Sequence, residues 1–422
     1  MTLDTQRNFN SGKAWLVVVV AMLCQIVFAF GMMKVPANMP IIIPTLGIDE
    51  VGAGNLMNAV GILSLIMCIP AGILMQKLGA RKIMLFALCC TCVGNIVGLV
   101  AGTNFGMLLF SRAIEGVGYG SQAVSVPQFI TEWFPPQKRG LPQGVISTWF
   151  AIGSFIILNL APALPGTAEG SWASSWIASI ILFVCVIVLA FFVLKSPGKD
   201  CIQIEVKPEL DENAPQVGLA TGLKSGATWL LMLSFVVFCF INSAYSSYFN
   251  TYLTQDFALD MATANGLSSI YSAVCIISGI AAGFILNKIP TTKRPIFLVI
   301  INVVLAALGL VMFNLPTVMF AIPFSILFGV FSCMAPPTVM SIAPESAYAP
   351  ETIPVTMGII SLASNLSGVL GTLVISLFKV GMDSWQACTI PNAIFAVISI
   401  IAVIVLLPAM RKKYRQLGML PA

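Results

Sequence analysis

Long apolar segments separated by short polar stretches make up most of this chain. A helix that crosses a membrane needs about 20 predominantly apolar residues. Twelve segments fit this requirement: 14–43, 51–76, 83–100, 107–131, 141–164, 174–194, 227–253, 264–286, 295–315, 317–343, 355–378 and 388–408. The pattern predicts an all-α membrane protein with twelve transmembrane helices.

Lysine and arginine residues are concentrated on one side of the predicted membrane. With the N-terminus in the cytoplasm, 18 of the 21 basic residues fall in cytoplasmic segments, which leaves Lys379 outside and Lys34 and Arg112 within spans. Cytoplasmic loops of membrane proteins carry such an excess of positive charge. The sequence therefore predicts a multi-pass protein of the cell (inner) membrane with both termini in the cytoplasm.

The composition narrows the function classes. Hydrophobic residues make up 58% of the chain and charged residues 9%, whereas soluble domains carry about 25% charged residues. Histidine, the commonest metal ligand, is absent. All eleven cysteines except Cys201 lie in apolar segments, where we expect small apolar side chains rather than disulfides. We expect a monomer in the lipid bilayer, with no cofactor, metal or nucleic-acid partner.

The chain reads as two halves. The one long polar stretch, residues 195–226, is expected to be a cytoplasmic linker between halves at 1–194 and 227–422. GILMQK (72–77) ends the second predicted span and GFILNK (283–288) ends the eighth, half a chain length later. Two looser matches, including Pro127 with Pro337, lie at nearly the same offset. Two six-helix halves in parallel repeat are typical of secondary transporters.

Several motifs resemble the major facilitator superfamily (MFS) of transporters over essentially the whole chain. The family's loop between spans two and three carries G-x-L-x-D-[RK]-x-G-[RK]-[RK], which this chain matches at Gly72, Leu74, Lys77, Gly79 and Arg81. SRAIEGVGYG (111–120) resembles the family's span-four R-x-x-[QE]-G-x-G element. EWFPPQKRGLPQG (132–144) and SNLSGVLG (364–371) are similar to runs in its organic-anion and nitrate/nitrite branches.

The chain departs from the family pattern in two places. The acidic position of the gating loop is Gln76, and its counterpart in the second half is Asn287, which precedes Lys288. Because the family's carboxylate helps to hold the outward-open state, the resemblance implies a weaker, neutral latch here. In span five, the glycine-asparagine-glycine pattern of nitrate porters and the G-x-x-x-G-P element of drug/proton antiporters are both missing.

Only three charged side chains lie within the predicted spans: Lys34, Arg112 and Glu115. An ionised group at the centre of a membrane helix costs about 2.5–3.5 kcal/mol on insertion scales. The i,i+3 spacing places Arg112 and Glu115 on one helix face, where they can pair. Lys34 lies at a similar depth in the first span, and the resemblance makes the first and fourth spans neighbours that line the transport cavity.

These three residues allow more than one interpretation. Arg112 and Glu115 can be an internal ion pair with a structural role. With Lys34, however, two cations face one anion, and an unpaired buried charge is costly, which favours an anionic substrate held by Lys34 and Arg112. A Lys34 side chain that reaches the outer headgroups is the alternative. Glu115 is the one carboxylate within the spans and hence the candidate proton carrier.

Span seven carries a polar and aromatic face. Asn242, Tyr245, Tyr248 and Tyr252 recur at spacings of three, three and four residues. We expect Asn242 and Tyr245, with Tyr248 as a further candidate, to contact substrate from the second half. An interfacial aromatic belt is the alternative, and it suits Tyr252 best. In span four, the glycines at 116, 118 and 120 are expected to allow close helix approach.

The features together predict a secondary transporter that moves a small organic anion by alternating access, with Glu115 as the coupling site if coupling is to protons. The alternatives are a drug or amphiphile efflux antiporter and a nitrate/nitrite-like porter of inorganic anions. We do not expect an enzyme, because the sequence offers no nucleophile–base set, metal cluster or soluble domain. Substrate identity and transport direction stay open.

The predicted topology can be tested by cysteine labelling. Single cysteines placed in residues 165–173 or 254–261 should react with a membrane-impermeant maleimide in intact cells. Cysteines placed in residues 195–225 or at the C-terminus should react only after permeabilisation, because the charge distribution places them inside. A central segment that reacts from outside would contradict the two-half repeat.

Overall fold

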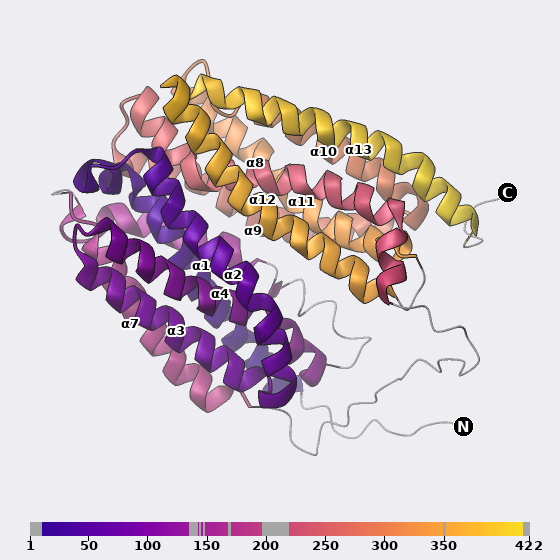
Figure 1. Ribbon diagram of the computed structural model, residues 1–422, viewed down its shortest axis with the longest axis horizontal. Helices are drawn as coiled ribbons and strands as arrows, with labels where there is room; N and C mark the ends of the chain where they lie inside the picture. Colours follow the sequence, from indigo (N-terminus) through magenta and orange to yellow (C-terminus); the bar gives the residue numbers. More distant parts are fainter. Residues whose placement is uncertain are drawn as a thin grey trace. The chain divides into compact units, whose positions relative to one another are not determined.

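The computed structural model describes residues 11–134, 142, 145–146, 148–167, 170–195, 219–348 and 352–416 of the 422-residue chain (Figure 1). Twelve α-helices of 12 to 36 residues lie in these ranges: α1 (Ser11–Leu46), α2 (Glu50–Leu78), α3 (Ala80–Ala101), α4 (Phe105–Trp133), α6 (Trp149–Leu160), α7 (Ala173–Val193), α8 (Gly226–Asp256), α9 (Met261–Lys288), α10 (Arg294–Val311), α11 (Ala321–Ser346), α12 (Ile353–Met382) and α13 (Thr389–Gln416). The same ranges contain no strand. The prediction of an all-α fold with twelve transmembrane helices is confirmed.

The helices carry the surface of a membrane protein. Within the described part of the chain, nine helices are long and apolar enough to cross a bilayer, and Trp149–Ala163 and Leu366–Met382 form shorter apolar helices. Large apolar side chains point outward, including Val100, Phe110, Ile277 and Phe284, each more than 60% exposed. Such extensive apolar exposure suits contact with lipid tails rather than water.

Most helix ends differ from the predicted spans by a few residues, and the larger differences are in spans five and twelve. Span twelve was expected over 388–408, but α13 continues to Gln416. Span five was expected over 141–164, but α6 covers Trp149–Leu160 and continues as a 3₁₀ turn over Ala161–Ala163. Most of residues 135–147 lie outside the described part of the chain. Pro162 explains the change of helix type, because it cannot donate a backbone hydrogen bond to residue 158.

Helix α1 passes through three prolines without ending. Pro36, Pro40 and Pro44 all lie inside the helix, which reaches Leu46. A proline removes one backbone hydrogen bond and usually breaks a helix in water. In a membrane helix the carbonyl groups freed by proline can be satisfied by neighbouring helices, side chains or small local adjustments of the backbone. The helix therefore stays intact past Lys34.

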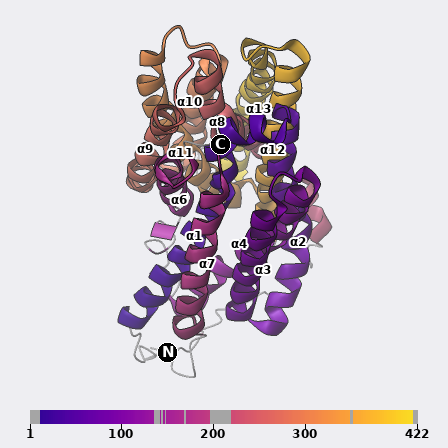
Figure 2. The same cartoon turned by 90° about the vertical axis from the view of Figure 1, so that its left-hand side faces the viewer.

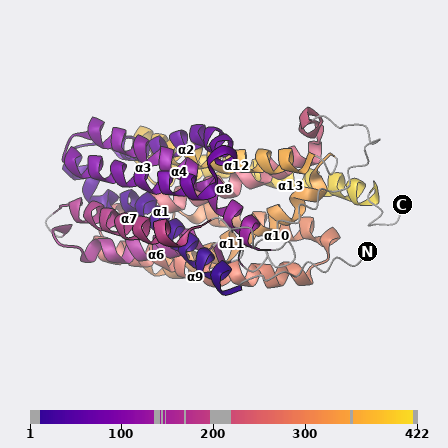
Figure 3. The same cartoon turned by 90° about the horizontal axis from the view of Figure 1, so that it is seen from below.

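The chain divides into two compact units, residues 1–47 with 55–214 and residues 48–54 with 215–422. In the first unit α3 packs along α4 and α7, and α1 packs along α4, α6 and α7 (Figure 3). In the second unit α8 packs along α12 and α13, α9 packs along α11, and α10 packs along α13 and α11 (Figure 2). The first unit holds the cluster of buried charges.

Glycines in α4 bring three helices of the first unit close together. A Cβ atom on Gly116 would lie 2.7 Å from the Val60 carbonyl oxygen of α2, and one on Gly118 would lie 2.0 Å from Thr91 Oγ1 of α3. A Cβ on Gly120 would lie 2.4 Å from the Ser64 carbonyl oxygen of α2. These glycines serve close helix packing, as predicted, and small residues are the usual means of close approach in membranes.

The packing at Gly118 can be tested with one added methyl group. Gly118→Ala should lower the melting temperature of the detergent-solubilised protein, because overpacking a tight contact costs about 1–3 kcal/mol. Gly266→Ala in α9 is the matched control, since nothing lies within 4 Å of the added Cβ. That variant should be neutral or slightly stabilising. Equal melting temperatures for the two variants would contradict the close contact.

Candidate functional site

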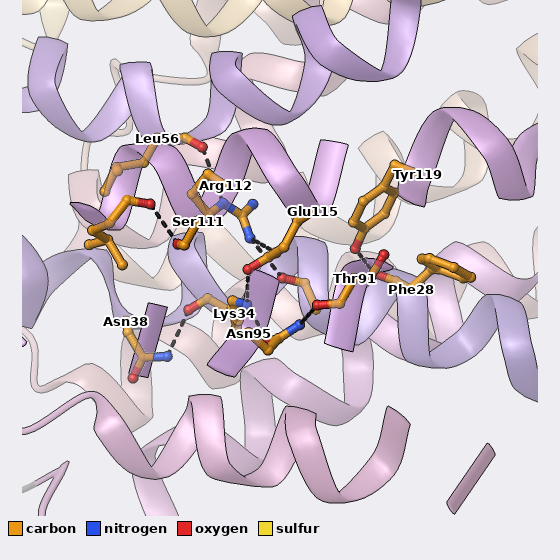
Figure 4. Close-up of polar contacts among 12 residues, drawn as sticks. Phe28, Lys34, Asn38, Leu56, Thr91, Asn95, Ser111, Arg112, Glu115 and Tyr119 are labelled. Atoms are coloured by element: carbon orange, nitrogen blue, oxygen red, sulfur yellow. Dashed lines mark hydrogen bonds and ion pairs between the residues drawn. The ribbon is translucent and has the colours of Figure 1, made fainter. Parts of the chain in front are cut away.

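The three charged residues of the spans form one buried cluster in the first unit (Figure 4). Glu115 binds both cations: its Oε1 lies 2.7 Å from Lys34 Nζ, and its Oε2 lies 2.5 Å from Arg112 Nη1. All three side chains are fully buried. The structure thus brings together two residues of α4 and one of α1, and the carboxylate bridges two positive charges.

Local structure sets the position of this cluster on α4. Asn104 caps the helix, and its side chain accepts a hydrogen bond from the Met107 backbone N–H at 3.0 Å. Arg112 and Glu115 then lie two to three turns from the capped end, on the face that meets α1. Gly94 of α3 leaves room for the carboxylate, because a Cβ there would lie 2.6 Å from Glu115 Cγ.

The Arg112 guanidinium contacts two other helices as well as Glu115 of its own helix, and one of its nitrogens has no acceptor among the described residues. Its Nε donates to the Leu56 carbonyl of α2 at 3.2 Å, and Nη1 donates to the Gly31 carbonyl of α1 at 3.3 Å as well as to Glu115. Nη2 is buried and has no hydrogen-bond partner among the described residues. Buried polar groups are normally satisfied, so this nitrogen is a donor without an acceptor.

Lys34 is enclosed by side chains from three other helices. Its ammonium group donates to Asn95 Oδ1 of α3 and to Glu115, and it lies 4.6 Å from the centre of the Trp176 ring of α7. Asn95 is itself oriented by a 2.8 Å hydrogen bond from Nδ2 to the Thr91 carbonyl. The side chain therefore does not reach the headgroup region, and the alternative of an exposed Lys34 is wrong.

Sequence reasoning missed two of these contacts. Asn95 had a detectable signal, since it is the lone amide in a strongly apolar span. Trp176 had none, because one aromatic residue in an apolar span is unremarkable by composition. Both stabilise a buried ammonium group, Asn95 through a hydrogen bond and Trp176 through the negative face of its ring.

The span-seven candidates lie in the second unit. Among the described residues, their hydrogen bonds are with neutral groups, and their rings pack against other aromatic rings. Tyr245 is buried, and its hydroxyl lies 3.0 Å from Ser325 Oγ and donates to the Ser268 carbonyl at 3.2 Å. Its ring packs against Phe249, Tyr271 and Phe328, with ring centres 4.5–4.8 Å apart. Asn242 is half-buried and accepts a 2.5 Å hydrogen bond from Tyr271.

Tyr248 and Tyr252 occupy other parts of the second unit. The Tyr248 hydroxyl is within hydrogen-bond distance of the carbonyl oxygens of Glu50, at 3.3 Å, and Thr372, at 3.2 Å. Tyr252 is 1% exposed and accepts a hydrogen bond from the Leu315 backbone N–H at 3.0 Å. A residue buried in this way cannot belong to an interfacial belt, so that interpretation of Tyr252 is wrong.

The gating-loop candidates are only partly described. Gly79 has φ +82°, a left-handed conformation that favours glycine, and it forms the turn between α2 and α3. Arg81 donates to the Phe191 carbonyl of α7 at 2.6 Å. Lys288 is exposed at the end of α9. Nothing is described for the side chains of the remaining four candidates, Gly72, Gln76, Lys77 and Asn287.

The described residues offer no group of three or more cysteine, aspartate or glutamate side chains that could hold a metal ion. What the first unit offers instead is a fully buried ion cluster, in which one carboxylate lies between two cations. One guanidinium nitrogen of the cluster, Arg112 Nη2, has no acceptor among the described residues.

Solved structures share the fold of this chain. A bacterial homologue of the human lysosomal transporter Spinster, in an inward-facing and unoccupied conformation, superposes with a TM-score of 0.73 at 13% identity, over 96% of this chain and 98% of that one. The Escherichia coli fucose:proton symporter gives a TM-score of 0.60 at 16% identity, over 93% and 99%. At such identities the likeness shows the fold alone.

Curated relatives match shorter stretches. MFS-type transporter ppz2 of Metarhizium majus is 31% identical over 116 residues, 28% of this chain and 19% of the relative. The uncharacterized MFS-type transporter YhcA of Bacillus subtilis is 24% identical over 202 residues, 46% and 36%. Sodium-dependent phosphate transport protein 1 of Rattus norvegicus is 21% identical over 245 residues, 54% and 51%. The chain thus spans about a fifth to a half of the length of these relatives.

A single family model covers most of the chain. The model described as Major Facilitator Superfamily matches residues 21–372, a range that begins in α1, includes all three buried charges and ends in α12. The resemblance that the gating-loop and span-four motifs predict is thereby confirmed, and the chain belongs to the Major Facilitator Superfamily.

Proposed function

We propose that the protein is a secondary transporter of a small organic anion, with Arg112 as the anion-binding group and Glu115 as the proton carrier. The observation that carries this proposal is the buried Arg112 Nη2, which has no acceptor among the described residues. A guanidinium group presents five donors in a planar fork suited to a carboxylate. An anion at this position would give the unused donor its acceptor.

Charge supports the same proposal. Lys34 and Arg112 contribute two positive charges and Glu115 one negative charge, all at zero exposure. Removing a charge from water costs several kcal/mol unless it is paired. Asn95 and Trp176 ease the burial of Lys34 without cancelling its charge. A bound monoanion would balance the charges of the cluster while Glu115 is ionised, and a dianion would balance them once Glu115 is protonated.

The bridging position of Glu115 suggests how proton and substrate are coupled. While ionised, the carboxylate uses one oxygen for each cation. Protonation turns it into a weaker acceptor with one donor, which releases Arg112 for the anion. By the same linkage, an anion that takes Arg112 makes protonation of Glu115 more favourable. Such reciprocity is what coupling between two ligands requires.

An inorganic anion is the second candidate. The rat relative is named a sodium-dependent phosphate transport protein, and an oxyanion such as phosphate also accepts hydrogen bonds from a guanidinium fork. A thermal-shift screen with organic acids, inorganic phosphate and nitrate separates the two candidates. A ligand at 100 times its Kd stabilises the folded protein by about 2.7 kcal/mol. Stabilisation by inorganic anions alone would overturn the organic-anion proposal.

Arg112→Gln should abolish anion binding at every pH. The substitution leaves Lys34 paired with Glu115, so the buried charges balance and the variant should fold. Losing one partner of a buried charge pair costs at least about 2 kcal/mol, or a rise in Kd of about 30-fold or more, measurable by calorimetry. Lys412→Gln, which removes an exposed positive charge, is the matched control. Unchanged affinity in Arg112→Gln would exclude Arg112 as the anion-binding group.

Glu115→Gln should bind the anion with little pH dependence. In the wild type, affinity should rise as pH falls, because protonation removes the competitor for Arg112. A glutamine is permanently neutral, so this competition disappears at all pH values. In proteoliposomes the variant should still exchange substrate but should not accumulate it when driven by a pH gradient.

The transport assay also decides the role of Glu115. If Glu115→Gln accumulates substrate against its gradient with a pH gradient as the sole driving force, Glu115 is only a structural partner of Arg112. The coupling group must then be the substrate itself or another ion.

A further inference from the structure

Toward the N-terminal end of α1 from the charged cluster, two further buried hydrogen bonds join α1 and α4. The Tyr119 hydroxyl of α4 donates to the Phe28 carbonyl of α1. Gln25 Nε2 of α1 donates to Gln122 Oε1 of α4 at 3.3 Å. The two side chains are 6% and 4% exposed. Neither residue belongs to a motif of the sequence, and neither takes part in the ion cluster.

The Gln25–Gln122 pair leaves hydrogen-bonding capacity unused. Gln25 Oε1 is buried and has no partner among the described residues. Turning both amides over would reverse the bond and leave a Gln25 N–H group unused instead of the oxygen. In either orientation, a group that both donates and accepts can complete the pair. A hydroxyl has this property, whereas a methyl group has no donor or acceptor.

The amide pair and the charged cluster lie on the same pair of helices. From Gly31, whose carbonyl accepts from Arg112, to Gln25 there are six residues of α1, and from Glu115 to Gln122 there are seven residues of α4. At about 1.5 Å per residue, the charged cluster and the amide pair are roughly 9–11 Å apart along the helices. Between them lie the rings of Phe28 and Tyr119, with centres 5.2 Å apart.

We infer that the substrate of the proposed transport function is a short hydroxy acid, whose anionic end binds Arg112 and whose hydroxyl binds the Gln25–Gln122 pair. The substrate then supplies the two missing hydrogen-bond partners, an acceptor for Arg112 Nη2 and a hydroxyl for Gln25. A hydrogen bond at each end takes up about 2.9 Å, so the ligand itself spans only roughly 3–5 Å. Its hydrocarbon body would pack against Phe28 and Tyr119.

The inference predicts a dependence on chain length. A series of ω-hydroxy acids, from 3-hydroxypropionate through 4-hydroxybutyrate and 5-hydroxyvalerate to 6-hydroxyhexanoate, is compared with the unsubstituted acids of equal carbon number. The readout is Kd, measured by calorimetry on the purified full chain. One neutral hydrogen bond should favour the hydroxy acid by about 3- to 10-fold at the best length, and the preference should be smaller at shorter and longer lengths.

The Gln25→Leu variant tests whether the Gln25–Gln122 pair binds the hydroxyl group of the hydroxy acid. It should remove the preference at every chain length while the pH dependence of binding, which belongs to Glu115, stays as in the wild type. Asn159→Leu is the matched control, because Asn159 is an exposed amide of α6 that bonds within its own helix. It should keep the full preference. Gln25→Glu is a second variant that keeps a polar side chain of similar shape, and its negative charge should weaken binding of every acid.

The outcomes separate this inference from the proposed function. If no member of the series and no other organic anion binds, the proposed function fails and the inference falls with it. If the acids bind through Arg112 but the wild type shows no preference for a hydroxyl, the inference alone is overturned. It is also overturned if Gln25→Leu keeps the wild-type preference, in which case the pair has a structural role or holds a water molecule only.

Discussion

The bridge from Glu115 to Lys34 and Arg112 is the interaction on which the first unit depends. It joins α1 to α4 directly, while Arg112 extends it to α2 through the Leu56 carbonyl and Lys34 extends it to α3 through Asn95. In a dry interior, charges of this kind interact far more strongly than in water. The three charged side chains of this bridge therefore connect four helices, α1, α2, α3 and α4.

The bridge can form because the helices pack closely. The glycines of α4 and Gly94 of α3 remove the side chains that would hold the helices apart. A Cβ at Gly94 would overlap Glu115 itself, and one at Gly118 would overlap Thr91 of α3. The second unit is built differently: α8, α9 and α11 are joined through Tyr245, with aromatic stacking and neutral hydrogen bonds rather than ion pairs. The two units thus share a fold but not the chemistry of their interiors.

The candidate site was only partly accessible from sequence. Lys34, Arg112 and Glu115 were found because charged residues are rare and costly in membrane spans. Their pairing across α1 and α4 needed the fold, since the depth of a residue does not say which way its side chain points. Asn95 and Gln25 were missed because single amides in apolar spans have several ordinary uses. The tyrosines of span seven share a helix face, yet Tyr245 and Tyr248 contact different neighbours, which spacing alone could not reveal.

The sequence by itself determined the number of helices, the family and the three charged residues, because these follow from apolar segment length, motif spacing and the cost of charge in lipid. The tertiary structure decided what each polar group contacts. It decided that α1 continues past three prolines, that Lys34 is enclosed rather than exposed, and that single atoms of Arg112 and Gln25 lack partners among the described residues. Hydrogen bonding depends on angstrom-scale positions of side chains from different helices, and those positions arise only when the helices pack.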